Sequence, residues 1–455
     1  MIQPPHDTNI LMSQIISRQP SGVVARAACR VDLAGGTMDM WPLYLFHPGS
    51  VVVNIAVRIM TTCRIIPTAS RGIELVSLDT GLADSFPSME ALRAAASYRH
   101  ALAAYLLRFF YADSEAASGF RLETHSESPA GAGISGSSAL MISTTAALAR
   151  FTGRKLPPEQ IREIAQNVEA QLIRVPTGCQ DYYPALYGGV SAVQLDVDGI
   201  HRQAIDCDAD ELDRRFVLAY TGAPRQSGIN NWEVFKRHID GDRRIFRNFE
   251  RIGEIARAMR GAVASADWEE TGRLLREEWK LRRTNAPAIA TPFIDQLITV
   301  ARRNGSLGAK VCGAGGGGCV LFMTSPDAKE RIEQKLAAAG AQILPFAVAR
   351  QGVSVRALKT VTKRKSRLIP RNFSRSTKTW KTLFDYGDAV VLMTKNDAGN
   401  VAEEGCSVCG ITPVENEEQA GIFGHPVGTV LYTVEFGDGS DKLVPESDLK
   451  STDAP

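Results

Sequence analysis

A glycine- and serine-rich segment at residues 129–139, Pro-Ala-Gly-Ala-Gly-Ile-Ser-Gly-Ser-Ser-Ala, constrains the fold of this chain more than any other feature. It follows a strand-like run at 120–125 and leads into residues of helical length and periodicity at 138–151. A helix that begins there points free backbone amides at an anion, and glycines let the backbone approach phosphate oxygens without Cβ clashes. The segment therefore predicts a polyphosphate site.

Taken alone, the segment leaves three interpretations open. Gly131, Gly133 and Gly136 form a G-x-G-x-x-G pattern, which suggests a dinucleotide fold if a strand with an acid at its end follows the helix. A second helix is expected there instead, at 157–173. No G-x-x-x-x-G-K-[S/T] pattern occurs, which excludes a P-loop ATPase, while a purely structural glycine turn stays open beside the phosphate site.

Composition indicates a globular protein with a small partner. The 455 residues, 44% of them hydrophobic, can form two or three units, and a net charge of +2 gives no reason to expect nucleic acid or a membrane. The eight cysteines lack the spacing of a secreted disulfide framework. Because no stretch resembles a leader or a membrane span, we expect a cytoplasmic protein.

Periodicity organises the first 358 residues into one α+β unit. A strand is expected at 50–66 and a helix at 92–110, and the residues from 227 to 304 are expected to be helical. A strand-like run at 310–323, interrupted by glycines, precedes a helix at 328–339. We expect these elements to share one compact fold.

The rest of the chain differs in character. Residues 359–381 are basic with no acid among them, and we expect a solvated linker that binds no nucleic acid. Residues 382–450 are acidic and strand-rich, which predicts a separate small β-barrel. Cys406 and Cys409 have the spacing of half a zinc site, but no second pair lies nearby, so we expect no metal there.

Two further segments carry a family resemblance. Residues 26–39 read Arg-Ala-Ala-Cys-Arg-Val-Asp-Leu-Ala-Gly-Gly-Thr-Met-Asp, and residues 310–319 read Lys-Val-Cys-Gly-Ala-Gly-Gly-Gly-Gly-Cys. Together with 129–139, and in this order, they resemble the GHMP kinases, the family of galactokinase, homoserine kinase, mevalonate kinase and phosphomevalonate kinase. The kinases of heptose phosphate and fucose are the most similar, because they share the Ala-Gly-Gly turn and an extra residue before the paired serines.

The resemblance implies a fold with defined parts. It implies an α+β GHMP kinase fold, with a ribosomal protein S5 domain 2-like, ATP-binding part at 22–205. A ferredoxin-like, helix-rich part is expected at 206–358. The linker at 359–381 then leads to a small barrel of SH3-like size at 382–450.

The resemblance also implies a catalytic site that uses ATP and Mg²⁺. Asp181 is expected to accept or orient the proton of the acceptor hydroxyl, with Arg30 beside it to keep it ionised and to stabilise transition-state charge. Ser138 and Glu169 are expected to hold Mg²⁺ through oxygen ligands. The ATP-binding residues are expected to be Pro129, Gly131, Gly133, Ser135, Gly136, Ser137 and Ser138. Without the resemblance, Asp181 is better interpreted as a surface or turn aspartate, while Glu169 fits a solvated helix face and Arg30 fits a structural salt bridge.

The acceptor side is expected to comprise Asp39, Thr37, Gly313, Gly315 and Arg225. Asp39 falls where sugar-directed members bind acceptor hydroxyls through a carboxylate. The chain departs from the usual heptose kinase pattern at residues 37–42 and at Ser135-Gly136. The identity of the sugar therefore stays open.

The resemblance predicts an ATP-dependent kinase that phosphorylates a hydroxyl, expected to be the anomeric one, of a sugar or sugar phosphate. Two alternatives remain. One is a non-catalytic sugar or nucleotide sensor, which the joint presence of Arg30, Glu169 and Asp181 argues against. The other is a kinase for a mevalonate-type alcohol, which Asp39 and its polar turn argue against. The sequence leaves self-association open.

Overall fold

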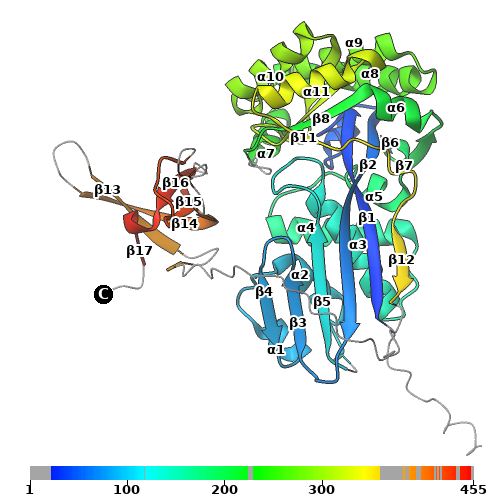
Figure 1. Cartoon of the computed structure of the whole chain (residues 1–455). Helices are drawn as coiled ribbons and strands as arrows, with labels where there is room; N and C mark the ends of the chain where they lie inside the picture. The colour runs from blue at the N-terminus through cyan, green and yellow to red at the C-terminus, as the bar shows by residue number, and fades with distance from the viewer. Residues whose placement is uncertain are drawn as a thin grey trace, which may run out of the picture. The chain divides into compact units, whose positions relative to one another are not determined.

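The computed structural model describes residues 22–116, 118–223, 229–358, 383–384, 389–395, 401–414, 417, 420, 423–436 and 441–451. The chain divides into two compact units, Met1–Val361 and Thr362–Pro455, and each is described by itself (Figure 1). The expected basic linker lies outside the described residues. In the part of the chain that is described, no helix combines the length and apolar character needed to cross a bilayer.

An eight-stranded sheet forms the first layer of the unit Met1–Val361. Its two longest strands, β1 (Val23–Ala34) and β2 (Ser50–Pro67), are antiparallel neighbours, and their side chains are mostly buried on both faces. The strand order is β12-β1-β2-β5-β3-β4, with β6 paired to β2 and β7 paired to β6. The other strands are β3 (Ile73–Ser77), β4 (Ala83–Phe86), β5 (Phe120–Ser126), β6 (Val190–Asp196), β7 (Gly199–Ile205) and β12 (Ser354–Ala357).

Helices pack on this sheet, and α3 (Gly136–Phe151) is the most deeply buried of them. Its small residues, mainly alanine, serine and threonine, let it lie close against β1 and β2. The prediction of one helix at 92–110 is wrong, because two helices, α1 and α2, form in this region. The Asp84 carboxylate accepts hydrogen bonds from the backbone N–H groups of Arg99 and His100, which fixes the start of the second helix. The remaining helices are α1 (Met89–Ala94), α2 (Ala101–Phe110), α4 (Pro158–Ile173) and α5 (Tyr182–Tyr187).

A four-stranded antiparallel sheet, in the order β11-β8-β10-β9, forms the second layer. Helices α8 to α11 gather around it at one end of the unit (Figure 1). The strands are β8 (Phe216–Tyr220), β9 (Ser306–Val311), β10 (Cys319–Thr324) and β11 (Gln342–Leu344). The helices are α6 (Ala209–Arg215), α7 (Ile229–Ile239), α8 (Arg243–Ala264), α9 (Trp268–Arg282), α10 (Pro292–Arg303) and α11 (Lys329–Ala338). Short 3-10 turns occupy η1 (Leu43–Phe46), η2 (Pro287–Ile289) and η3 (Pro326–Ala328).

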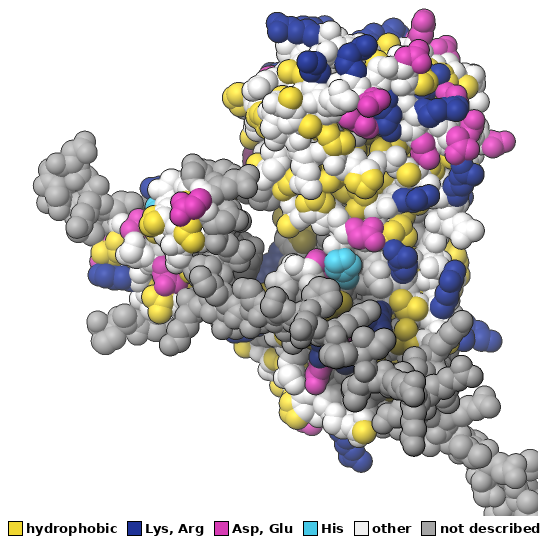
Figure 2. Space-filling view, viewed as in Figure 1, with side chains coloured by type: hydrophobic (Ala, Val, Ile, Leu, Met, Phe, Trp, Pro, Cys, Tyr) yellow, Lys and Arg dark blue, Asp and Glu magenta, His cyan; other side chains and the backbone are white. Residues whose placement is uncertain are grey.

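Helix α8 joins the two layers. Phe249, in its first half, packs in the core of the four-stranded sheet, whereas Ile255 and Met259 pack in the core of the eight-stranded sheet. The apolar face of this one helix therefore packs into both cores, and this packing holds the two sheets together. Figure 2 shows charged side chains of both signs dispersed over the visible face of this unit, in keeping with the small net charge.

The unit Thr362–Pro455 contains an antiparallel sheet in the order β16-β15-β14-β13-β17. Its core includes Val390, Val408 and Tyr432. The end strands β16 and β17 are not paired with each other among the described residues, so the expected closed barrel is not seen. The elements are β13 (Ala389–Lys395), β14 (Val401–Pro413), β15 (Val430–Phe436), β16 (Asp441–Pro445), η4 (Glu446–Asp448) and β17 (Leu449–Ser451).

One of the two inner strands of the four-stranded sheet, β10, offers a test of the fold. Phe322 on β10 is fully buried, so Phe322→Ala should lower the free energy of unfolding by about 3–5 kcal/mol through lost burial and a residual cavity. Urea unfolding measures the change. Val197→Ala, at a residue that is 84% exposed, is the control and should change stability by less than about 0.5 kcal/mol. A loss below about 1 kcal/mol at Phe322 would contradict this packing.

Candidate active site

The first glycine loop, residues 129–135, turns the chain sharply before α3 begins. Gly131, Gly133 and Ser135 all have positive φ, of 65°, 79° and 62°. Serine is uncommon in this left-handed region, and the Ser135 Oγ is buried without a hydrogen-bond partner in the described structure. A strained residue with an unsatisfied hydroxyl at a helix N-terminus is suited to receive a ligand.

The second glycine loop, residues 312–318, lies directly against the first. The backbone N–H of Cys319 donates to the carbonyl oxygen of Ala132 over 2.7 Å. A Cβ atom on Gly318 would come within 2.8 Å of that same oxygen, so only glycine fits there. Gly315 packs as closely on the other side, where a Cβ would lie 2.7 Å from the Ile289 carbonyl oxygen. The two loops therefore support each other through backbone contacts.

Arg30 and Asp181 form the central ion pair of the site. The Arg30 Nε and Nη2 both donate to the Asp181 Oδ1, over 2.9 and 2.5 Å, and its Nη1 donates to the Gly133 carbonyl oxygen over 3.0 Å. Burial disfavours the charged guanidinium, but the carboxylates of Asp181 and Asp32 outweigh it and raise the pKa of Arg30 above its usual value. The Asp181 side chain is 22% exposed, so a ligand can reach it. The pair joins β1, the first glycine loop and the start of α5.

Asp39 lies close to Asp181. Its Oδ2 accepts a hydrogen bond from the Gln180 backbone N–H over 2.9 Å, and Gly178 leaves room for it, since a Cβ there would lie 2.0 Å from the same oxygen. Burial, and then the negative charge of Asp181, raise the pKa of Asp39 to about 6. The site thus holds two adjacent carboxylates, which suit a ligand that donates hydrogen bonds.

Thr37 and Gly313 are linked by an arginine that sequence reasoning did not select. Residues 35–42 form a turn, named the acceptor turn after its expected role, in which Thr37 has a φ of 76°. Its Oγ1 donates to the Asn231 Oδ1 over 3.1 Å and accepts from the Arg282 Nη2 over 3.3 Å. The same Arg282 nitrogen donates to the Gly313 carbonyl oxygen over 2.7 Å. Arg225 lies outside the described residues.

Glu169 and the paired serines also come together. The hydroxyls of Ser137 and Tyr182 donate to the two Glu169 carboxylate oxygens, each over 2.7 Å, and Ser138 follows Ser137 in the first turn of α3. Burial raises the pKa of Glu169. The described residues contain no cluster of three or more histidine, cysteine or acidic ligands. Mg²⁺ does not require such a cluster, because in kinases it binds one or two carboxylates together with substrate phosphates. Glu169 and the neighbouring serine hydroxyls therefore fit a Mg²⁺ ion.

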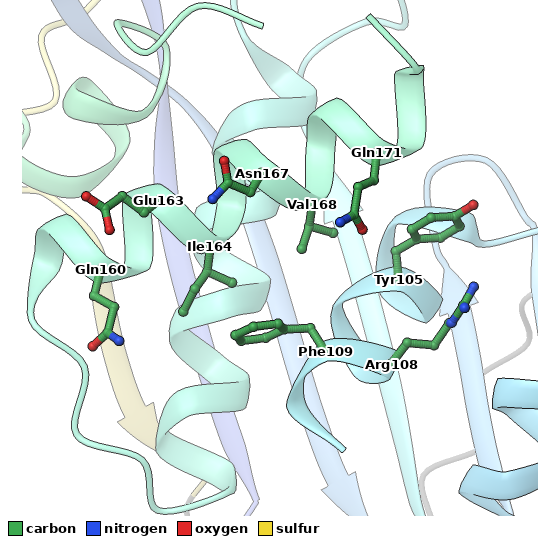
Figure 3. A pocket seen from close by; sticks show the side chains of 9 residues that line it. All are labelled: Tyr105, Arg108, Phe109, Gln160, Glu163, Ile164, Asn167, Val168 and Gln171. Carbon is green, nitrogen blue, oxygen red and sulfur yellow. The ribbon is translucent and has the colours of Figure 1, made fainter. Parts of the chain in front are cut away.

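A cavity of about 550 Å³ opens between α2 and α4 (Figure 3). Gln160 lines the cavity, and Glu169 comes nine residues later on the same helix. Nine residues make two and a half helical turns, which places the two side chains on opposite sides of the helix. Glu169 therefore points to the opposite side of α4 from the cavity. The lining residues are Tyr105, Arg108, Phe109, Gln160, Glu163, Ile164, Asn167, Val168 and Gln171.

Sequence reasoning missed a group of buried charges behind the site, made up of Asp32, Lys310, Glu278 and Arg282. Two of them left a signal. Asp32 follows Arg30 by two residues, so both lie on one face of β1. Lys310 interrupts an apolar run on β9, between Ala309 and Val311, where a lysine needs a buried partner.

Comparison with known proteins agrees with this arrangement. Residues 97–189 match the family model of the GHMP kinases N terminal domain, and residues 258–342 match that of the GHMP kinases C terminal domain. The first contains the glycine loop, Glu169 and Asp181, and the second contains the second glycine loop. By class, the protein is therefore a phosphotransferase that uses ATP. More particularly, the chain contains the N-terminal and C-terminal domains of the GHMP kinases, and the predicted resemblance to that family is confirmed.

Among similar curated proteins, the D-glycero-alpha-D-manno-heptose 7-phosphate kinase of Campylobacter jejuni is 25% identical over 334 residues, which cover 71% of this chain and 96% of that protein. The bifunctional fucokinase/GDP-fucose pyrophosphorylase of Arabidopsis thaliana is 24% identical over 70% of this chain, but the match spans 31% of that longer protein. The predicted resemblance to sugar-directed members is thereby confirmed.

Solved structures show the same fold. A D-glycero-D-manno-heptose 1-phosphate kinase from Bacteroides thetaiotaomicron superposes with a TM-score of 0.60 at 22% identity, covering 74% of this chain and 99% of that one. Galactokinase from Lactococcus lactis superposes with a TM-score of 0.60 at 17% identity, covering 74% of this chain and 95% of that one. The predicted GHMP kinase fold is confirmed for the first unit.

The raised pKa of Asp39 predicts a pH-dependent stability. In the folded protein the pKa of Asp39 is about 6, against an ordinary value of 3.8. As the pH rises, the unfolded chain therefore loses this proton at a lower pH than the folded protein does. The folded state is destabilised as the pH rises from about 3.8 to about 6. Asp39→Asn removes the effect. The free energy of unfolding of the variant, relative to that of the native protein, should therefore rise by about 2 kcal/mol as the pH is raised from about 4 to about 8.

Urea unfolding of both proteins across this pH range measures the difference. Asp196→Asn, at an exposed aspartate, is the matched control and should change stability by less than about 0.5 kcal/mol. A constant difference between Asp39→Asn and the native protein would show that burial does not perturb Asp39.

Proposed function

We propose that the protein transfers the γ-phosphate of ATP to a hydroxyl group, the anomeric one, of a sugar or sugar phosphate. The main support for this proposal is the Arg30–Asp181 ion pair, which has the Asp39 carboxylate beside it and lies next to a glycine loop at a helix N-terminus. The similarity to kinases of heptose phosphate and fucose supports a sugar as acceptor.

The geometry suits proton removal from the acceptor. Asp181 is partly exposed and paired with Arg30, so its carboxylate can orient an acceptor hydroxyl and take its proton. Arg30 remains charged and lies between Asp181 and the first glycine loop, where negative charge develops during phosphoryl transfer. Asp39 would accept a hydrogen bond from a second hydroxyl of the sugar and so select its orientation.

The ATP phosphates are proposed to lie along the first glycine loop and the N-terminus of α3. Ser138 and Glu169 would hold Mg²⁺, which when bound supplies positive charge across the phosphates. Gly313 and Gly315 would support the acceptor side, and Thr37 would hold the acceptor turn in place. The proposed contacts to ATP come from Pro129, Gly131, Gly133, Ser135, Gly136, Ser137 and Ser138.

The division of the chain into an ATP-binding part at 22–205 and a second part at 206–358 belongs to the same proposal. The linker at 359–381, the SH3-like barrel at 382–450 and the cytoplasmic location stay predictions from the sequence. The described sheet in the unit Thr362–Pro455 is compatible with a small partner-binding module.

An acceptor screen tests the function directly. ADP release by the full chain is measured with ATP and Mg²⁺ over free sugars, sugar phosphates and small alcohols such as mevalonate. We expect stimulation by a sugar or a sugar phosphate. Stimulation by the alcohols alone would replace the proposed acceptor class, and no stimulation by any compound would favour a sugar or nucleotide sensor.

Asp181→Asn should lower kcat by about 100- to 10,000-fold while ATP still binds, because the amide keeps the shape but cannot accept the proton. ADP release gives kcat, and calorimetric titration with ATP gives the dissociation constant. Asp196→Asn, at the exposed end of β6, is the control and should retain full turnover. Turnover within about threefold of native in Asp181→Asn would remove Asp181 from this role.

Glu169→Gln should raise the Mg²⁺ concentration for half-maximal activity by about tenfold or more, since a neutral amide binds a hard cation poorly. Mg²⁺ titrations at saturating ATP measure the shift. Glu163→Gln is a matched control, because Glu163 lies on the same helix and lines the cavity on the opposite side. Equal Mg²⁺ requirements in the two variants would count against Glu169 as a ligand.

A further inference from the structure

Five charged side chains lie buried behind the acceptor turn and form the buried charge network, which consists of Arg30, Asp32, Lys310, Glu278 and Arg282. Lys310 is at its centre. Its Nζ lies 2.5 Å from the Asp32 Oδ2 and 2.6 Å from the Glu278 Oε2, and all three side chains are almost completely buried. A single ammonium group therefore holds two carboxylates away from water.

Such a network does little for net stability. Removing three charges from water costs several kcal/mol for each ion, and well-packed apolar residues of similar volume often serve as well or better. The network is also balanced in charge, since Arg30, Lys310 and Arg282 face Asp32, Glu278 and, at one end, Asp181. A role in positioning explains this arrangement better than a role in stability.

The network connects the parts that surround the reacting groups. The Asp32 Oδ1 lies 3.5 Å from the Arg30 Nη1 and accepts a long, 3.5 Å hydrogen bond from the Gly313 N–H. Arg282 donates to the Gly313 carbonyl oxygen and to Thr37. Because β1, α9, β9, the second glycine loop and the acceptor turn all meet here, a shift at Lys310 would reach each of them.

The arginine is shared between two carboxylates. Arg30 contacts Asp181 over 2.5 Å and Asp32 over 3.5 Å, so the two acids compete for one guanidinium. Lys310 neutralises Asp32 from the other side and leaves Arg30 with Asp181. Without that ammonium, the field of Asp32 would draw Arg30 back along β1 and away from Asp181.

We propose that Lys310 is a positioning residue for phosphoryl transfer, which holds Asp32 so that Arg30 stays against Asp181 and the second glycine loop stays in register. This inference rests on the proposed function for its kinetic consequences. Displacement of a catalytic group by about 1 Å costs on the order of 100-fold in rate. The nucleotide contacts proposed above do not involve Lys310, so ATP binding should be spared.

Lys310→Met keeps the length of the side chain and removes the charge. We expect kcat to fall by about 100-fold while the KM for ATP changes by less than about threefold. The variant should also lose thermal stability, because Asp32 and Glu278 are left buried with too little positive charge. A kcat within about threefold of native would overturn the proposal.

The double variant Lys310→Met/Glu278→Gln separates positioning from stability. It restores the charge balance of the network, so the thermal midpoint should recover, but Asp32 still lacks its ammonium and kcat should stay low. Recovery of kcat together with stability would overturn the proposal. Should Lys310→Met fail to fold, the double variant alone decides between these outcomes.

A readout without turnover keeps this inference separate from the proposed function. Native protein that is inactive with every acceptor would refute the kinase, whereas the Arg30 Nε–H NMR signal reports the contact with Asp181 in either case. Exchange of this proton with solvent should be faster in the double variant than in the native protein. Equal exchange would show that Lys310 does not hold Arg30.

Discussion

The site depends on one desolvated guanidinium. Arg30 is buried beneath the first glycine loop, where its backbone N–H donates to the Ile134 carbonyl oxygen and its side chain donates to the Gly133 carbonyl oxygen and to Asp181. A charge in such surroundings is tolerated only when carboxylates compensate for the lost water. The loop, the helix start that carries Asp181 and the strand β1 are therefore fixed relative to each other by a single side chain.

Several parts of the site are locally unfavourable, and the rest of the fold compensates for them. Ser135 has a left-handed backbone and an unsatisfied buried hydroxyl, and Asp39 is buried beside another acid. These costs are borne by two large apolar cores that α8 joins, and by α3, whose small residues pack almost completely against the long strands. Local strain at this position, next to a helix N-terminus, is what a preorganised phosphate site requires.

The sequence predicted those features that short-range chemistry determines. The glycine-rich turn, the helix α3 that follows it and the strand at β2 follow from local patterns. Arg30 and Asp181 lie 151 positions apart, and only the family resemblance connected them. Lys310 interrupts an apolar strand, which indicates a buried partner, but nothing local identifies that partner as Asp32, 278 positions away. The break between α1 and α2 was missed for a related reason, because it depends on Asp84 in a separate strand.

The two ends of the site differ in chemical character, and this difference would order the proposed reaction. The end at the first glycine loop offers backbone N–H groups and the positive pole of α3, which attract phosphate. The other end offers the carboxylates of Asp39 and Asp181, which repel phosphate and accept hydrogen bonds from hydroxyls. A polyphosphate and a polyol thus favour opposite ends. Arg30 lies between them and contacts both ends, so the transferred group would cross the site beside its charge.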